Sequence, residues 1–177
     1  MRGKKHEKIQ LEDGSRLVLR DGRKSHYLTF ASVFESVFFR DHMIEDVDPR
    51  AELFVIFRQE DKLDKSGMKI VTSESPVGVL QITPKRASRI TISNPHPTFH
   101  TLDWVGLVPN LRSSNLEQKI IQEFLKNERL LVETTSEEYA HTYKDIGFNT
   151  VYEDEDYVAI ANFDTDRRTA VPALLGY

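Results

Sequence analysis

The stretch VGLVPNLRSSNLEQKII, residues 105–121, joins the end of an apolar strand to the start of an amphipathic helix. The strand ends at Pro109, which has no backbone N–H to continue a sheet ladder, and apolar residues recur at helical spacing after Ser114. The first turn of a helix exposes unpaired N–H groups at the positive end of the helix dipole. This arrangement is typical of loops that bind phosphate, and the segment to test is residues 112–117.

Two residues in this loop differ from the glycines that phosphate-binding loops usually carry. Asn115 is a tolerable replacement, because Asn adopts a positive φ more readily than most residues. Glu117 instead adds a side chain and a negative charge where phosphate would lie. Ser114 and Glu117 also have the spacing of a capping box, in which the two side chains satisfy the free amides themselves. The sequence thus supports two interpretations, a phosphate-binding loop and a self-capped helix.

The composition is that of one ordinary globular domain. The chain has 177 residues, of which 39% are hydrophobic and 29% are charged, and its net charge is -4. We therefore expect neither a nucleic-acid partner nor a membrane-bound protein. The absence of cysteine excludes disulfides, thiol nucleophiles and thiolate metal sites, and it favours a cytoplasmic location. His96, His100 and Asp103 are close in sequence, but we expect no metal site there.

The order of elements predicts an α/β fold. Apolar strand patterns occupy residues 15–21, 52–58, 76–83, 100–108 and 129–134, a hairpin pattern occupies 149–163, and residues 89–93 are a further strand candidate without an evident place. Helical patterns occupy residues 25–39, the segment after residue 114, and residues 136–148. The first helix would bury a stripe made of Leu28, Ala31, Phe34, Val37 and Phe38. Hairpins early in the chain and crossover helices late in it indicate a mixed central sheet with helices on both faces.

Two local patterns carry a family resemblance. In the first, Leu107, Val108 and Pro109 are followed by Arg112, by Asn115 and Glu117 at two glycine positions, and by the aliphatic pair Ile120 and Ile121. The second pattern consists of Ala140, Tyr143, Gly147 and Phe148. In this order and spacing, residues 14–163 resemble the GCN5-related N-acetyltransferase (GNAT) superfamily. The resemblance implies a single GNAT-type domain in which strands 103–108 and 129–134 are parallel neighbours that splay apart.

The resemblance also implies a function and a set of site residues. The expected activity is acyl-CoA-dependent N-acylation, most simply transfer of acetyl from acetyl-CoA to a small-molecule or protein amine. The pantetheine arm of coenzyme A would pair with the backbone of Leu107 and Val108. The pyrophosphate would bind the amides of residues 112–117, namely Arg112, Ser113, Ser114, Asn115, Leu116 and Glu117. Tyr143 would be the general acid, and Asp103 is the candidate general base.

An alternative is a non-catalytic subunit that keeps the GNAT fold. Residues 1–13 form a basic N-terminal arm, and residues 164–177 combine Arg167 and Arg168 with an apolar end. Both segments lie outside the predicted domain at residues 14–163. They are therefore candidate contact surfaces for a protein partner or for a second copy of the chain.

Overall fold

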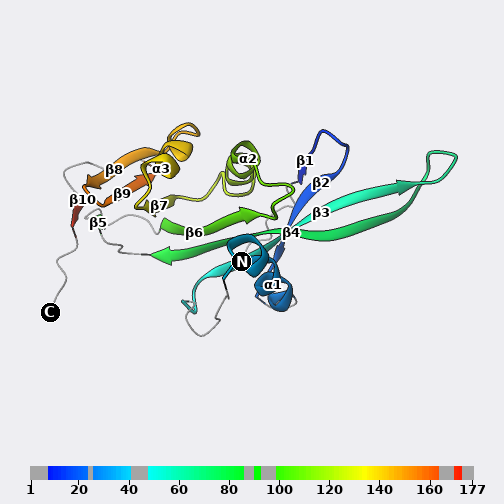
Figure 1. Cartoon of the computed structure of the whole chain (residues 1–177), viewed down its shortest axis with the longest axis horizontal. Coiled ribbons are helices and arrows are strands. Elements are labelled where there is room, and N and C mark those ends of the chain that lie inside the picture. Colours follow the sequence, from blue (N-terminus) through cyan, green and yellow to red (C-terminus); the bar gives the residue numbers. More distant parts are fainter. Residues whose placement is uncertain are drawn as a thin grey trace. The chain divides into compact units, whose positions relative to one another are not determined.

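The structure is a computed structural model that describes residues 8–23, 26–40, 48–85, 90–92, 99–163 and 170–172. Its elements, in chain order, are β1 (Lys8–Gln10), β2 (Arg16–Asp21), α1 (Tyr27–Phe38), β3 (Glu52–Leu63), β4 (Lys69–Lys85), β5 (Ile90–Ile92), β6 (Phe99–Leu107), α2 (Ser114–Phe124), β7 (Leu130–Thr134), α3 (Glu137–Lys144), β8 (Asn149–Asp154), β9 (Tyr157–Ala161) and β10 (Ala170–Pro172) (Figure 1). Most of both predicted tails, like His96, lies outside the described residues. Strand β1, however, belongs to the sheet although residues 1–13 were predicted to be an arm.

The sheet is mixed, as the sequence predicts. Eight strands are hydrogen-bonded in the order β1-β2-β3-β4-β6-β7-β9-β8. Strands β6 and β7 are parallel, with His100 opposite Leu130 and Thr101 opposite Leu131, and α2 is the crossover between them. Pairs β1–β2, β2–β3, β7–β9 and β8–β9 are antiparallel. The parallel pairing joins His100 and Thr101 to Leu130 and Leu131.

The chain divides into two compact units, and the first comprises Met1–Gln81 with Trp104–Lys126. In this unit α1 and α2 lie on opposite faces of the sheet (Figure 1). Helix α1 buries Phe30, Val33, Phe34 and Val37 against strand residues that include Leu53, Val55, Phe57 and Val79. The prediction that Leu28 joins this stripe is wrong, because its side chain is 83% exposed. At about 3.6 residues per turn, Leu28 lies on the opposite side of the helix from the centre of the buried stripe.

Glycine at position 106 brings α1 directly against β6. A Cβ added there would lie 2.6 Å from a methyl carbon of Val37 and 2.9 Å from the ring of Phe38. Gly78 on β4 has the same role on the other side of the strand pair, since its Cβ would lie 2.7 Å from the Leu107 side chain. Any larger residue at these positions would separate elements that now touch.

The second unit comprises Ile82–Asp103 with Asn127–Tyr177. Its core contains Phe99, Leu131, Val151, Tyr157, Ala159 and Ala161. Helix α3 packs on β7 and β9. Strands β5 and β10 form a separate antiparallel pair, which gives the unplaced segment at residues 89–93 a partner that the sequence did not indicate.

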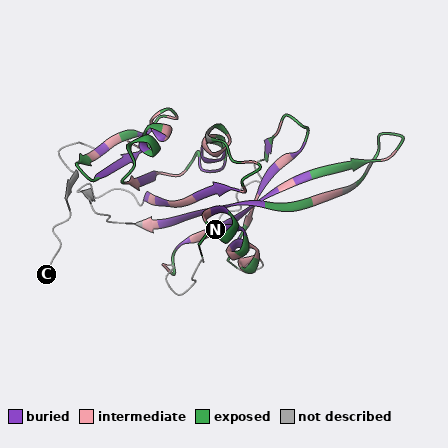
Figure 2. Ribbon diagram, viewed as in Figure 1, coloured by how far each residue is buried: buried purple, intermediate pink, exposed green. Residues whose placement is uncertain are grey.

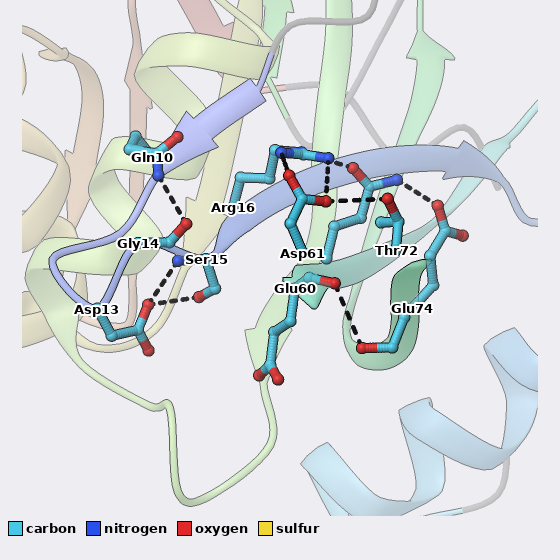
Figure 3. Close-up of polar contacts among 11 residues, drawn as sticks. Gln10, Asp13, Gly14, Ser15, Arg16, Glu60, Asp61, Thr72 and Glu74 are labelled. Atoms are coloured by element: carbon cyan, nitrogen blue, oxygen red, sulfur yellow. Dashed lines mark hydrogen bonds and ion pairs between the residues drawn. The ribbon is translucent and has the colours of Figure 1, made fainter. Parts of the chain in front are cut away.

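Strands β3 and β4 form a long hairpin that extends past its neighbour β2, whose pairing with β3 reaches Gln59 (Figure 2). Charged side chains hold the base of this arm. The Arg16 guanidinium donates to both carboxylate oxygens of Asp61 at 2.9 and 3.1 Å, and the Thr72 hydroxyl donates to Asp61 at 2.9 Å (Figure 3). Arg20 and Gln59 both donate to Glu74. These bonds connect β2, β3 and β4 across the strands.

The tip of the arm is a tight turn with exposed apolar side chains. The Asp64 carboxylate accepts the N–H groups of Ser66 and Met68, each at 2.8 Å. Side chains become more exposed toward this end, where Leu63, Met68 and Ile70 are each more than half exposed (Figure 2). No helix in the described part of the chain has the length and apolar character needed to span a membrane.

Candidate functional site

The loop before α2 caps its helix with Ser113 rather than Ser114. Ser113 is extended, with φ -151° and ψ 143°, and its hydroxyl accepts the N–H of Leu116 at 3.2 Å. Its carbonyl accepts the N–H groups of Leu116 and Glu117, both at 3.1 Å. The third residue after the cap is Leu116, which has no carboxylate. The prediction of a capping box between Ser114 and Glu117 is therefore wrong.

The Glu117 side chain instead turns inward and is half-buried. Its carboxylate accepts a hydrogen bond from the backbone N–H of Leu107 at the end of β6. Burial raises the pKa of Glu117, and the Leu107 bond and the positive charge of Arg112 oppose this shift. The Glu117 side chain thus interacts with two other residues that the sequence singled out, Leu107 and Arg112.

The orientation of the Leu107 N–H explains how Glu117 reaches it. Val108 donates its own N–H to the carbonyl of Val77 on β4 at 2.8 Å. Because successive N–H groups of a strand point to opposite edges, the Leu107 N–H points away from β4. Glu117 therefore occupies a backbone donor on the edge of β6 opposite to β4, and this is the donor expected to pair with a pantetheine arm.

Arg112 ties the loop to helix α1. Its Nη2 donates to the carbonyl of Val37 at 2.5 Å, where the negative end of the α1 dipole favours a cation. The backbone N–H of Arg112 lies 3.4 Å from the Pro109 carbonyl in a turn. Of the predicted cradle, the N–H groups of Arg112, Leu116 and Glu117 thus have acceptors within the loop. For Ser113, Ser114 and Asn115 the helix itself provides no acceptor, so these three amides can bind an anion.

Tyr143 is placed by helix α3. Ser136 is the N-cap and accepts the N–H of Tyr139 at 3.2 Å, and Gly147 ends the helical segment with a φ of 95°. The Tyr143 ring is 3% exposed and packs edge-on against Phe148, with 5.4 Å between ring centroids. Its hydroxyl lies 2.7 Å from the hydroxyl of Tyr139, whose ring is 41% exposed. A buried phenol is thus hydrogen-bonded to a phenol that reaches solvent.

Asp103 lies on β6 in the second unit and is half-buried. The buried hydroxyl of Thr83, on β4, donates to its carboxylate. This bond helps to fix the position of the carboxylate. The sequence singled out neither Thr83 nor the role of Tyr139, although Tyr139 stands four residues before Tyr143, the spacing of neighbours on a helix face.

Of the two histidines considered for a metal site, the structure describes His100. It lies beside Glu128, in the loop between α2 and β7. Its Nδ1 is 3.3 Å from Oε2 of Glu128. In the described part of the chain, no group of three or more His, Asp or Glu side chains is arranged to hold a metal ion.

The comparisons with known proteins support the fold. The sequence matches no protein-family model and no curated protein. Among solved structures, the chain is similar to a histone acetyltransferase HPA2 and related acetyltransferase from Corynebacterium glutamicum, with 15% identity, a TM-score of 0.52, and coverage of 95% of this chain and 99% of that one. The chain therefore has the fold of GNAT acetyltransferases.

Two further solved structures are more distant. A KacTA–DNA complex matches with 8% identity, coverage of 67% of this chain and 72% of that one, and a TM-score of 0.45. A spermidine N-acetyltransferase SpeG chimera from Vibrio cholerae and hSSAT matches with 11% identity, coverage of 81% and 92%, and a TM-score of 0.42.

Proposed function

We propose that the chain is an N-acyltransferase, most simply an N-acetyltransferase that uses acetyl-CoA and a small-molecule or protein amine. The main support for this proposal is the structure at the start of α2. After β6 the chain turns through Pro109 into a helix whose amides at Ser113, Ser114 and Asn115 have no acceptor within the helix. Such a helix start favours the binding of a pyrophosphate. The GNAT-type fold and the sequence resemblance support coenzyme A as the ligand of this segment.

The residues present fit coenzyme A if Glu117 moves. The three open amides would hold the pyrophosphate, and the backbone of Leu107 and Val108 would pair with the pantetheine arm. Acetyl-CoA supplies the acyl thioester. The Glu117 carboxylate must leave the Leu107 N–H before that donor can bind a ligand carbonyl. Protonation of Glu117, which burial favours, weakens its bond to Leu107 and removes its charge from the phosphate site.

Proton transfer is assigned to two residues of the second unit. The Asp103 carboxylate, held by Thr83, would accept the proton that the amine loses as its nitrogen bonds to the acyl carbon. Tyr143 would donate its hydroxyl proton to the sulfur as the carbon–sulfur bond breaks. Tyr139, 2.7 Å from Tyr143, would return a proton from solvent to the Tyr143 hydroxyl. The buried Tyr143 phenol thus has a route to solvent through a single neighbour.

Calorimetric titration of acetyl-CoA tests the cofactor site, with Ser114→Pro as the sharpest variant. Proline is favoured at the first helical position, and the extended Ser113 suits a following proline, so this change removes one N–H and leaves the helix intact. We expect normal stability and affinity lower by about ten-fold or more, since a hydrogen bond to a charged group contributes about 1.5 to 3 kcal/mol. Equal binding by wild type and Ser114→Pro would contradict the assignment of this amide.

A non-catalytic subunit with the same fold is the second candidate. The bond between Glu117 and Leu107 favours it, because it fills with the chain's own carboxylate a donor that an enzyme would present to its cofactor. Residues 1–13 and 164–177 are then the candidate surfaces for a protein partner or a second copy. Absence of acetyl-CoA binding by both the wild type and Glu117→Gly would support this candidate and exclude the enzyme.

A further inference from the structure

An aromatic cluster joins the C-terminal end of α1 to β6 within the first unit. It consists of Phe34, Phe38 and Trp104. The Trp104 ring lies edge-on to Phe34 at 5.4 Å and tilted to Phe38 at 5.1 Å, and the two phenylalanines are 4.8 Å apart. Phe38 and Trp104 are only partly buried. The close approach at Gly106 holds this end of the helix against the strand.

A cation of the chain lies over this cluster. The guanidinium carbon of Arg40 is 4.7 Å from the centroid of Trp104 and 5.9 Å from that of Phe34. These distances are within the range of cation–π attraction, for which tryptophan is the strongest partner. Arg40 itself is exposed, so water reaches the cation that covers the rings.

The backbone before Arg40 has an unusual conformation. Phe39 has φ 55° and ψ 36°, a left-handed conformation that is rare for a bulky residue, and its side chain is 80% exposed. Its N–H donates to the Glu35 carbonyl at 2.8 Å, which closes the last turn of α1. Helices often end in a left-handed residue, but glycine or asparagine is the usual choice there. An exposed phenylalanine thus stands at the point from which Arg40 extends.

The helix end adds to the attraction for positive charge. The last carbonyls of α1 carry the negative end of the helix dipole, and the Arg112 guanidinium already binds the Val37 carbonyl there. The aromatic faces and the helix carbonyls in this region each attract cations.

We propose that the cluster of Phe34, Phe38 and Trp104 is a binding site for a cationic group of the amine acceptor, and that Arg40 occupies it when no acceptor is bound. The acceptor part of this proposal rests on the proposed acyltransfer. A reacting amine must be neutral to attack, so the bound cation is a second ammonium or guanidinium group on the same molecule. Trp104 directly follows the candidate base Asp103 in the chain.

The fluorescence of Trp104, the only tryptophan in the sequence, tests cation binding without acetyl-CoA. Methylguanidinium is titrated at constant ionic strength, with neutral methylurea as its isosteric control. We expect a saturable change with methylguanidinium alone. Removing the competing side chain in Arg40→Ala should tighten this binding about two- to five-fold, the range expected for cation–π attraction at an exposed site.

Arg50→Ala is the matched control, because Arg50 is an exposed arginine that pairs with the Asp48 carboxylate instead of an aromatic ring. It should bind methylguanidinium as the wild type does. A response that does not saturate, an equal response to methylurea, or identical affinities in Arg40→Ala and Arg50→Ala would each overturn the proposal.

Kinetics then connect the site to the acceptor. Trp104→Leu should raise KM about two- to five-fold for amines that carry a second cationic group, with little change in kcat, and Trp104→Phe should retain the lower KM. Cation binding without any acetyl transfer would refute the proposed function and leave the cation site standing. Acetyl transfer with no difference between cationic and neutral acceptors in any variant would refute the acceptor assignment and leave the function standing.

Discussion

Helices α2 and α3 begin with the same serine N-cap, but they turn different side chains inward. In each, an extended serine, Ser113 or Ser136, accepts the N–H of the third following residue at 3.2 Å. In α2 the acid of the first turn, Glu117, turns inward to a strand amide. In α3 both first-turn acids, Glu137 and Glu138, are exposed, and the inward group is the phenol of Tyr143.

The contrast shows that a helix start does not by itself define a binding site. The two caps satisfy the same amide, so their contributions to stability should be similar. What differs is the group that each helix turns inward, which is Glu117 in the first turn of α2 and Tyr143 in the second turn of α3. In α2 that group is an acid that competes with a ligand, and in α3 it is a proton donor linked to solvent.

The largest expected effect is on turnover, at α3. If Tyr143 is the general acid, Tyr143→Phe should fold normally and reduce kcat by about 10² to 10⁴-fold, because only the proton donor is removed. Affinity for acetyl-CoA should change little. Steady-state kinetics with calorimetry measure both quantities.

Tyr139→Phe is the matched control for that variant. It removes the other hydroxyl of the same hydrogen bond, so it should alter stability to a similar extent but reduce kcat much less, since Tyr143 keeps its proton. An unchanged kcat in Tyr143→Phe would remove this residue from the mechanism.

The next effect concerns the acid of α2. Glu117→Gly should tighten coenzyme A binding, because it removes a charge near the phosphate site and frees the Leu107 N–H. It should also lower the free energy of unfolding by about 1 to 3 kcal/mol, since it introduces glycine into a helix and leaves a buried amide without its acceptor. Urea unfolding and calorimetry test the two parts separately. Lower stability without coenzyme A binding would support the non-catalytic candidate, and a variant with neither change would contradict the described role of Glu117.

Removing either N-cap should have a smaller effect on stability, and the effect should be similar for the two helices. Ser113→Ala and Ser136→Ala should each lower the free energy of unfolding by about 1 kcal/mol. Ser114→Ala and Thr135→Ala, one residue away, should be nearly neutral because neither position is the N-cap. Thermal unfolding of the four variants checks this, and a larger loss in Ser114→Ala than in Ser113→Ala would restore the capping box that the structure excludes.

The smallest effect is a pH dependence. Burial raises the pKa of Glu117 above its ordinary 4.5, so the folded state binds this proton more tightly than the unfolded state. The contribution of Glu117 to stability is therefore greatest below 4.5 and decreases as pH rises through the raised value. Glu117→Gln removes this titration and should gain stability relative to wild type between about pH 4 and pH 7.

Comparing Glu117→Gln with wild type isolates the contribution of Glu117 to the pH dependence of stability. Asp64 and Glu74 have lowered pKa values, so they make both proteins more stable as pH rises, and their contribution cancels in the comparison. Chemical unfolding at several pH values gives the difference. A free energy of unfolding that falls in Glu117→Gln relative to wild type as pH rises would contradict the raised pKa of Glu117.

Features with a local cause were predictable from the sequence. Apolar runs and a helix of sufficient length predicted the parallel pairing of β6 and β7, and Gly147 marked the end of the α3 segment. The predicted cap of α2 was one residue too late, because Ser113 and Ser114 are equally suited to the N-cap. Only the backbone conformation distinguishes the two serines.

Features that depend on distant partners were not predictable. The inward turn of Glu117 requires the Leu107 amide, which reaches it only after β6 and α2 have packed together. The pairing of β5 with β10 joins two strands of three residues each, too short for a periodic pattern to identify. Pro76 suggested a strand start, yet β4 begins at Lys69 and continues through it as part of the long hairpin.

That hairpin makes the turn at residues 64–68 a natural place to lengthen the chain. The carboxylate of Asp64 closes this turn locally, and the Arg16–Asp61 pair anchors the arm at its base. Exposed loop tips tolerate insertion better than segments whose backbone is buried. A peptide tag or a fluorophore attached there would be carried at the end of a two-stranded stem, outside both the α2 loop and the aromatic cluster, and could report on their ligands without occupying either position.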